Sequence, residues 1–63
     1  MLWKVRTTMS DRPGALAALA RSCGERDVNI LGLQIFPGAR GVTDELVLRV
    51  PEDWRSAEVA GLV

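Results

Sequence analysis

The segment Asp11-Arg12-Pro13-Gly14 holds the residue types in this chain that are best suited to bind a small charged molecule. It interrupts a strand-like pattern and precedes a helical one, so the unpartnered first backbone N–H groups of that helix lie beside it. Those groups and the positive end of the helix dipole suit a carboxylate. Gly14 lets a ligand approach the backbone, and Asp11 can hold an ammonium group. Asn29 is a further candidate, because its amide both donates and accepts hydrogen bonds, as the two ends of an amino acid require.

Each of these residues also has a structural interpretation, which the sequence leaves open. Gly14 can permit close packing of the helix on the sheet. Asp11 can bond the loop backbone, and Asn29 can be a turn residue before a strand. Arg12 can be a solvated side chain.

Catalytic chemistry is hard to assemble from this inventory. The chain contains no histidine, no tyrosine and no nucleophile motif. Asp44 and Glu45 are neighbours in a predicted strand, so their side chains point to opposite faces and cannot act together. Cys23 falls on an apolar helical stripe, which indicates core packing, and one thiol without histidine supplies no zinc ligand set. We therefore expect no enzyme activity, no catalytic residue, no metal and no cofactor.

Length and charge narrow the class of protein further. The 63 residues contain eight Lys and Arg and eight Asp and Glu, so the formal net charge is zero. Such a chain lacks the basic field that nucleic-acid binders and anionic-membrane binders use. No apolar stretch approaches the ~20 residues of a membrane span, and no signal-peptide pattern opens the chain. We expect one cytoplasmic domain over residues 1–63, without disulfides and with a core small enough to need a partner surface.

The elements that must position the candidate residues follow from periodicity and from the glycines and prolines. Apolar residues alternate in the strands and recur every three or four positions in the first helix. We predict strands at Leu2–Met9, Ile30–Phe36 and Thr43–Val50, and helices at Ala15–Arg26 and Trp54–Val63. This order predicts an α+β fold: a ferredoxin-like βαββα(β) two-layer sandwich, with an antiparallel sheet, two helices on one face and the last strand missing. We expect the chain to be a fragment of a longer protein, since an uncovered sheet edge invites pairing.

The placement of the candidate residues resembles the ACT domain, a small βαββαβ regulatory module that binds amino acids in metabolic enzymes and sensors. The resemblance covers nearly the whole chain, short of the last strand, and rests on Asp11-Arg12-Pro13-Gly14, Leu16, Leu19 and Val28-Asn29-Ile30. It implies a pocket between the loop of one subunit and the second strand of its neighbour. Asp11, Arg12 and Gly14 of one chain would then face Asn29 and Ile30 of the other.

We accordingly expect an allosteric regulatory domain that binds an amino acid or a similar small ligand and controls an attached or partner metabolic enzyme. A homodimer is predicted, with first strands or first helices meeting across a two-fold axis and Leu2 in the contact, alongside the stems of Lys4 and Arg6. Two alternatives stay open: a purely structural dimerisation module without a ligand, and an RNA-binding ferredoxin-like domain. The RNA-binding alternative has basic residues on the sheet, but Phe36 is the only aromatic residue of its second and third strands.

Overall fold

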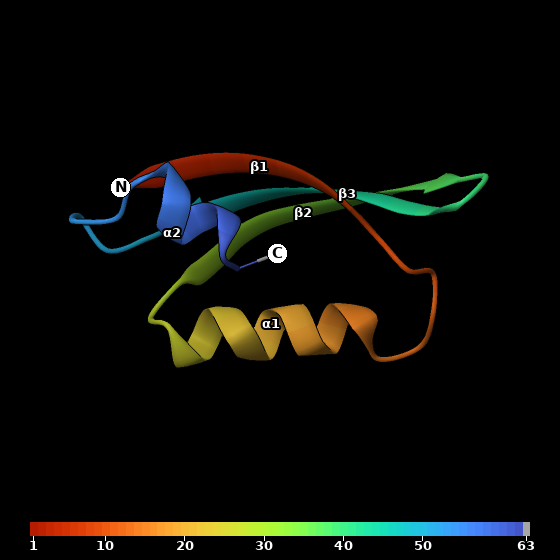
Figure 1. Cartoon of the computed structure of the whole chain (residues 1–63), viewed down its shortest axis with the longest axis horizontal. Coiled ribbons are helices and arrows are strands. Elements are labelled where there is room, and N and C mark those ends of the chain that lie inside the picture. The colour runs from red at the N-terminus through yellow and green to blue at the C-terminus, as the bar shows by residue number, and fades with distance from the viewer. Residues whose placement is uncertain (63) are drawn as a thin grey trace.

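The computed structural model describes residues 1–62 and has an α+β fold, with a three-stranded antiparallel sheet and two helices (Figure 1). The elements are β1 (Leu2–Met9), α1 (Ala15–Glu25), β2 (Asn29–Gly38), β3 (Gly41–Arg49) and α2 (Ser56–Ala60). The first strand has the predicted bounds, and α1 ends one residue earlier than predicted. α2 begins two residues later than predicted, and Val63, the predicted end of that helix, lies outside the described residues.

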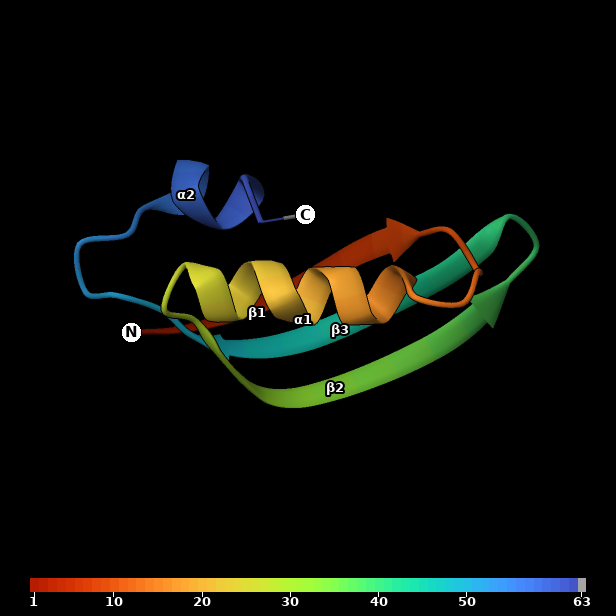
Figure 2. The same ribbon diagram turned by 90° about the horizontal axis from the view of Figure 1, so that it is seen from below.

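The sheet has β3 in its centre, with the strand order β1-β3-β2 and both neighbours antiparallel to β3. α1 runs along one face of the sheet, and α2 lies beside β1 at the end near the N-terminus (Figures 1 and 2). β1 and β2 are therefore the two edge strands of the described part of the chain.

The core lies between α1 and the sheet face that it covers. The alternation of β3 places Leu46 and Leu48 on this face, where both are 1% exposed, and leaves Arg49 on the other face. The apolar stripe expected on α1 is confirmed in part: Leu19 and Cys23 are buried and Leu16 is half-buried, but Ala20, expected on the same stripe, is exposed. Leu62, which follows α2, joins the same cluster.

β2 is the least covered element of the fold. Its pairing with β3 shifts between Ile30 and Gly32, so the extra residue, Leu31, bulges from the ladder. Along its length the strand rises away from α1 (Figure 1), and its large apolar side chains stay exposed from the bulge onward. These exposed side chains belong to Leu31, Leu33, Ile35 and Phe36.

A close backbone contact holds the turn between β2 and β3 against the end of β1. Gly41 has a φ of 131°, and a β-carbon built on it would lie 2.6 Å from the carbonyl oxygen of Met9. Only glycine permits both this conformation and this approach. The contact fixes the start of the loop that leads from Met9 to α1.

Candidate functional site

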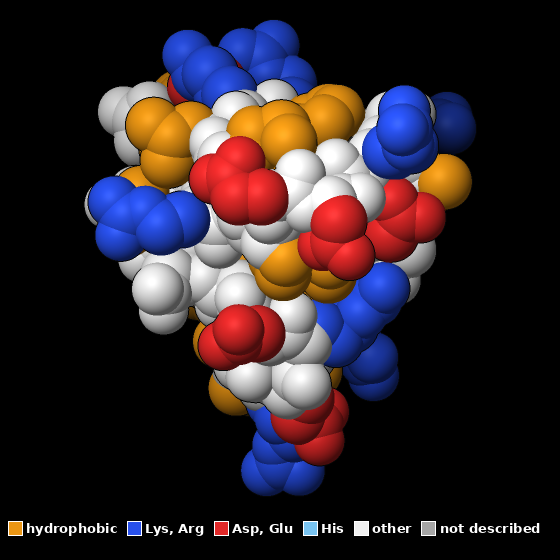
Figure 3. All heavy atoms as spheres, turned by 90° about the vertical axis from the view of Figure 1, so that its left-hand side faces the viewer, with side chains coloured by type: hydrophobic (Ala, Val, Ile, Leu, Met, Phe, Trp, Pro, Cys, Tyr) orange, Lys and Arg blue, Asp and Glu red, His pale blue; other side chains and the backbone are white. Residues whose placement is uncertain are grey.

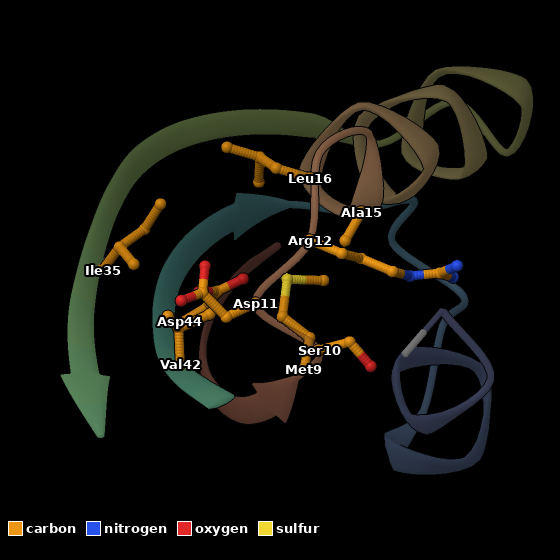
Figure 4. Close-up of a pocket in the computed structure, with 9 residues that line it drawn as sticks. All are labelled: Met9, Ser10, Asp11, Arg12, Ala15, Leu16, Ile35, Val42 and Asp44. Atoms are coloured by element: carbon orange, nitrogen blue, oxygen red, sulfur yellow. The ribbon is translucent and has the colours of Figure 1, made fainter. Parts of the chain in front are cut away.

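A small cavity of about 140 Å³ lies between the β1–α1 loop, the start of α1 and the outer parts of β2 and β3 (Figure 4). Two of its residues, Asp11 and Arg12, are among those predicted to bind a ligand. The walls are mostly apolar, and the polar groups come from the loop and from one aspartate of β3. The lining residues are Met9, Ser10, Asp11, Arg12, Ala15, Leu16, Ile35, Val42 and Asp44.

Asp44 is the most unusual residue of this cavity. It is 0% exposed, and neither of its carboxylate oxygens accepts a hydrogen bond from residues 1–62. In the register of the sheet it lies between Thr7 of β1 and Ile35 of β2, on the face that α1 covers. Buried carboxylates are normally paired or hydrogen-bonded, because removing their charge from water is costly. This side chain therefore requires an explanation beyond folding.

The loop that closes the cavity is short and turned back on itself. The backbone N–H of Arg12 donates to the carbonyl of Ser10 at 3.0 Å, and that of Ala15 donates to the carbonyl of Arg12 at 3.3 Å. In Figure 4 the guanidinium of Arg12 points away from Asp44, out of the cavity. Arg12 thus lines the cavity with its backbone and stem and does not neutralise the buried carboxylate.

Gly14 is the N-cap of α1 and has a left-handed conformation, with φ 88° and ψ −13°. A β-carbon at this position would meet nothing within 4 Å, so close packing of helix on sheet does not explain the glycine. No side chain caps the helix, and its first turn contains no acidic residue. Gly14 borders a second, shallower hollow of about 300 Å³ on the outer side of α1, lined also by Ala17, Ala18 and Arg21.

Asn29 and Ile30 lie at the other end of the sheet from the cavity. They pair with Arg49 and Leu48, whereas the cavity residue Ile35 pairs with Asp44. At about 3.3 Å per residue, most of the length of β2 separates Asn29 from the loop. Within a single subunit, Asp11 and Arg12 therefore lie together at the cavity, and Gly14 lies next to them in the chain. Asn29 and Ile30 of the same subunit lie too far away to reach them. Their approach from a neighbouring subunit stays a prediction.

Asp44 is absent from the residues predicted to bind a ligand. The prediction that Asp44 and Glu45 point to opposite faces of the sheet is confirmed. Asp44 is buried on the face that α1 covers, and Glu45 lies on the open face. The signal that points to Asp44 is the alternation of β3, which places this carboxylate on the same strand face as Leu46 and Leu48.

The open face of the sheet carries a small ion-pair cluster. Glu45 lies 2.7 Å from the Arg6 guanidinium and 3.3 Å from the Lys4 ammonium. The hydrogen bond from Arg6, followed by that from Lys4, holds the pKa of Glu45 below its usual range. Two of the basic residues that an RNA-binding face would use are thus paired with an acid. Acidic and basic side chains also mix at the end of the molecule beside α2 (Figure 3).

Within residues 1–62, no three His, Cys, Asp or Glu side chains gather closely enough to hold a metal ion. Neither helix in this part of the chain has the length and apolar character that a bilayer crossing demands. Comparison with protein-family models, curated proteins and solved structures finds no match to the chain.

Proposed function

We propose that this chain is a regulatory domain of the ACT type, which binds a small amino acid under the β1–α1 loop and forms a homodimer that controls a metabolic enzyme. The observation that carries the proposal is the cavity beneath that loop, whose lining includes Asp11 and Arg12 and a fully buried carboxylate. A purely structural dimerisation module would have no need of a buried carboxyl group without hydrogen-bond partners beside a cavity.

The strand order supports a ferredoxin-like arrangement. In a split βαββαβ fold the first and third strands pair in the middle of the sheet, and the second strand lies outside the third. The order β1-β3-β2 with α1 on one face agrees with this arrangement. The outer edge of β1 is the place where a final strand would pair.

The exposed apolar residues of β2 favour the edge of β2 over the edge of β1 as the dimer contact. The edge of β1 presents Leu2 next to the charged side chains of Lys4 and Arg6, whereas four of the six residues from Leu31 to Phe36 of β2 are large, apolar and exposed. Antiparallel pairing of two β2 strands about Leu33 would join the two sheets into one, with both α1 helices on the same side. Asn29 of the partner subunit would then lie near Pro37, at the end of the sheet that carries the cavity. This geometry supplies the neighbouring strand that the ACT resemblance requires.

The first experiment is a thermal-shift screen of the twenty amino acids against the whole chain. We expect at least one small amino acid to raise the melting temperature, because a ligand that binds only the folded state stabilises it. Ala15→Leu would fill the cavity and should abolish the shift. Ala20→Leu is the matched control, since Ala20 is exposed on the same helix and lines neither hollow. The amino-acid function is wrong if no amino acid shifts the wild-type protein, and the site is wrong if the Ala15→Leu protein keeps the full shift.

The second experiment concerns Asn29. Asn29→Ala should weaken binding about tenfold to a hundredfold, because hydrogen bonds to charged groups contribute roughly 1.5–3 kcal/mol. Asn29 is exposed at the first position of β2, so the substitution should change the free energy of unfolding little. Unchanged affinity would remove Asn29 from the site while leaving the cavity itself in place.

A further inference from the structure

We propose that the cavity under the β1–α1 loop selects ligands by a primary ammonium group, and that Asp44 is the residue that holds this group. The inference rests on the proposed binding function and goes further, because it assigns the charge of the ligand, its orientation and a binding residue.

The burial of Asp44 is complete, and its two oxygens have no hydrogen-bond donor among residues 1–62. An ionised carboxylate removed from water gains stability from a cation that donates hydrogen bonds to it. A primary ammonium group has three N–H donors and a compact positive charge, so it can serve both oxygens. The side chain is one of those that line the cavity, so a ligand that enters and displaces the apolar side chains over the carboxylate can reach it.

Residues 1–62 bring no cation to this carboxylate. Arg12 is the only basic residue that lines the cavity, and its guanidinium points outward in Figure 4. Lys4 and Arg6 lie on the opposite face of the sheet, where both pair with Glu45. The second acid of the cavity, Asp11, adds negative charge near the loop. The electrostatic field inside the cavity therefore favours a positive ligand and disfavours a carboxylate at the inner end.

The lining of the cavity determines the rest of the ligand. Met9, Leu16, Ile35 and Val42 supply apolar walls to the cavity, and surroundings of low polarity strengthen the attraction between opposite charges. At about 140 Å³ the cavity is close to the roughly 150 Å³ of an engineered protein cavity that binds benzene. The ligand is therefore a short aliphatic amine, with its ammonium group inward. In an amino acid, the carboxylate would face outward, toward the start of α1.

The test compares three probes that differ in a single charged group. L-Alanine has both groups, ethylamine lacks the carboxylate, and propionate lacks the ammonium group. Each is titrated into the isotopically labelled whole chain, and binding is followed by chemical-shift changes of backbone N–H groups around the cavity. We expect ethylamine and L-alanine to bind and propionate not to bind. Binding of propionate as strong as that of ethylamine would overturn the inference.

The variants Asp44→Asn and Asp44→Leu test the residue itself. Each should weaken ethylamine binding at least about tenfold, because a charge-assisted hydrogen bond is lost. Glu45→Gln is the matched control, since it removes the neighbouring carboxylate of β3 on the opposite face; it should leave the affinity unchanged. If L-alanine binds the wild-type and Asp44→Asn proteins equally, the inference is overturned and the amino-acid function stands. If ethylamine binds through Asp44 and no amino acid binds, the inference stands and the amino-acid function fails.

Stability without a ligand provides an independent measurement. A buried carboxyl group that has no partner until a ligand binds destabilises the ligand-free protein. Asp44→Leu should therefore raise the melting temperature in the absence of amines. The amine should then raise the melting temperature of the wild-type protein only. A lower melting temperature for both Asp44 variants without a ligand would show that the carboxylate supports the fold, and would overturn the inference.

Discussion

Gly14 adopts a left-handed conformation at the start of α1, with φ 88° and open space around the position of its missing side chain. Its role is therefore conformational, and no steric clash contributes. Gly14→Ala should lower the free energy of unfolding by about 1–2 kcal/mol, the cost of a left-handed conformation for an L-residue. Gly24→Ala is the control within the same helix. A β-carbon at Gly24 would also meet open space, so this substitution should raise the free energy of unfolding by about 0.5–1 kcal/mol. Urea denaturation of both variants measures the difference, and a neutral Gly14→Ala would contradict the conformational role.

Cys23 is 1% exposed in the core, and its burial raises the pKa of the thiol. The thiolate, which is the reactive form, is therefore disfavoured in the folded state. Because the pKa is higher in the folded than in the unfolded protein, the stability that this group contributes is complete below the usual thiol pKa and declines as the pH rises above about 8.5. Alkylation by iodoacetamide at pH 8 should be slow for the native protein and fast in urea. Equal rates in the two conditions would place the thiol outside the core.

Glu45 joins two elements, since it lies on β3 and pairs with Lys4 and Arg6 of β1. Hydrogen bonds from Arg6 and Lys4 lower its pKa, so its contribution to stability is present near neutral pH and is lost as the pH falls into the acid range below about 4. The difference in stability between wild type and Glu45→Gln should therefore be largest near pH 7 and disappear on acidification. Added salt should also reduce it, because the pair faces solvent. A difference that is constant with pH would exclude the ion pair as its cause.

Gly41 connects the β2–β3 turn to the end of β1. Its φ of 131° and the 2.6 Å between a built β-carbon and the Met9 carbonyl oxygen exclude other residues, because the clashing atom belongs to the backbone. Gly41→Ala should lower the free energy of unfolding by about 2–3 kcal/mol and displace the β1–α1 loop. Gly32→Ala is the control, since a β-carbon there would make ordinary 3.7 Å contacts with Val47. Thermal denaturation of the two variants tests the assignment, and equal melting temperatures would contradict it.

The sequence predicts the elements better than it predicts how they cover one another. Leu2–Met9 alternates with period two, and Leu16, Leu19 and Cys23 share a helical face, so these patterns determine β1 and α1 directly. β2 is apolar on both faces, and its bulge at Leu31 shifts the register, so alternation alone does not assign its exposed side. The burial of Asp44 depends on the β1–α1 loop and on α1, which lie far from it in the sequence. A local pattern within β3 therefore does not predict that burial.

At the scale of the whole molecule, the described residues form an elongated body of 36 × 19 × 18 Å in which one edge of the sheet is apolar and uncovered. A long, exposed, apolar edge strand favours pairing with another strand. α1 covers the centre of the sheet (Figure 2). Leu33, near the middle of β2, stays 39% exposed. The molecule thus presents one surface that a second copy of the chain can complete by adding strands.

The dimer prediction follows from the symmetry of that edge. If two β2 strands pair about Leu33, this residue lies opposite its own copy across the two-fold axis, so Leu33→Lys places two positive charges together and should dissociate the dimer. Leu2→Lys is the matched control on the edge of β1, where Leu2 is 63% exposed. Sedimentation velocity at micromolar concentration should show a wild-type dimer, a Leu2→Lys dimer and a Leu33→Lys monomer. The opposite pattern, with only Leu2→Lys monomeric, would establish the contact through first strands that the sequence alone predicts. A wild-type monomer would refute both interfaces, and with them the arrangement that brings Asn29 of the partner subunit toward the cavity.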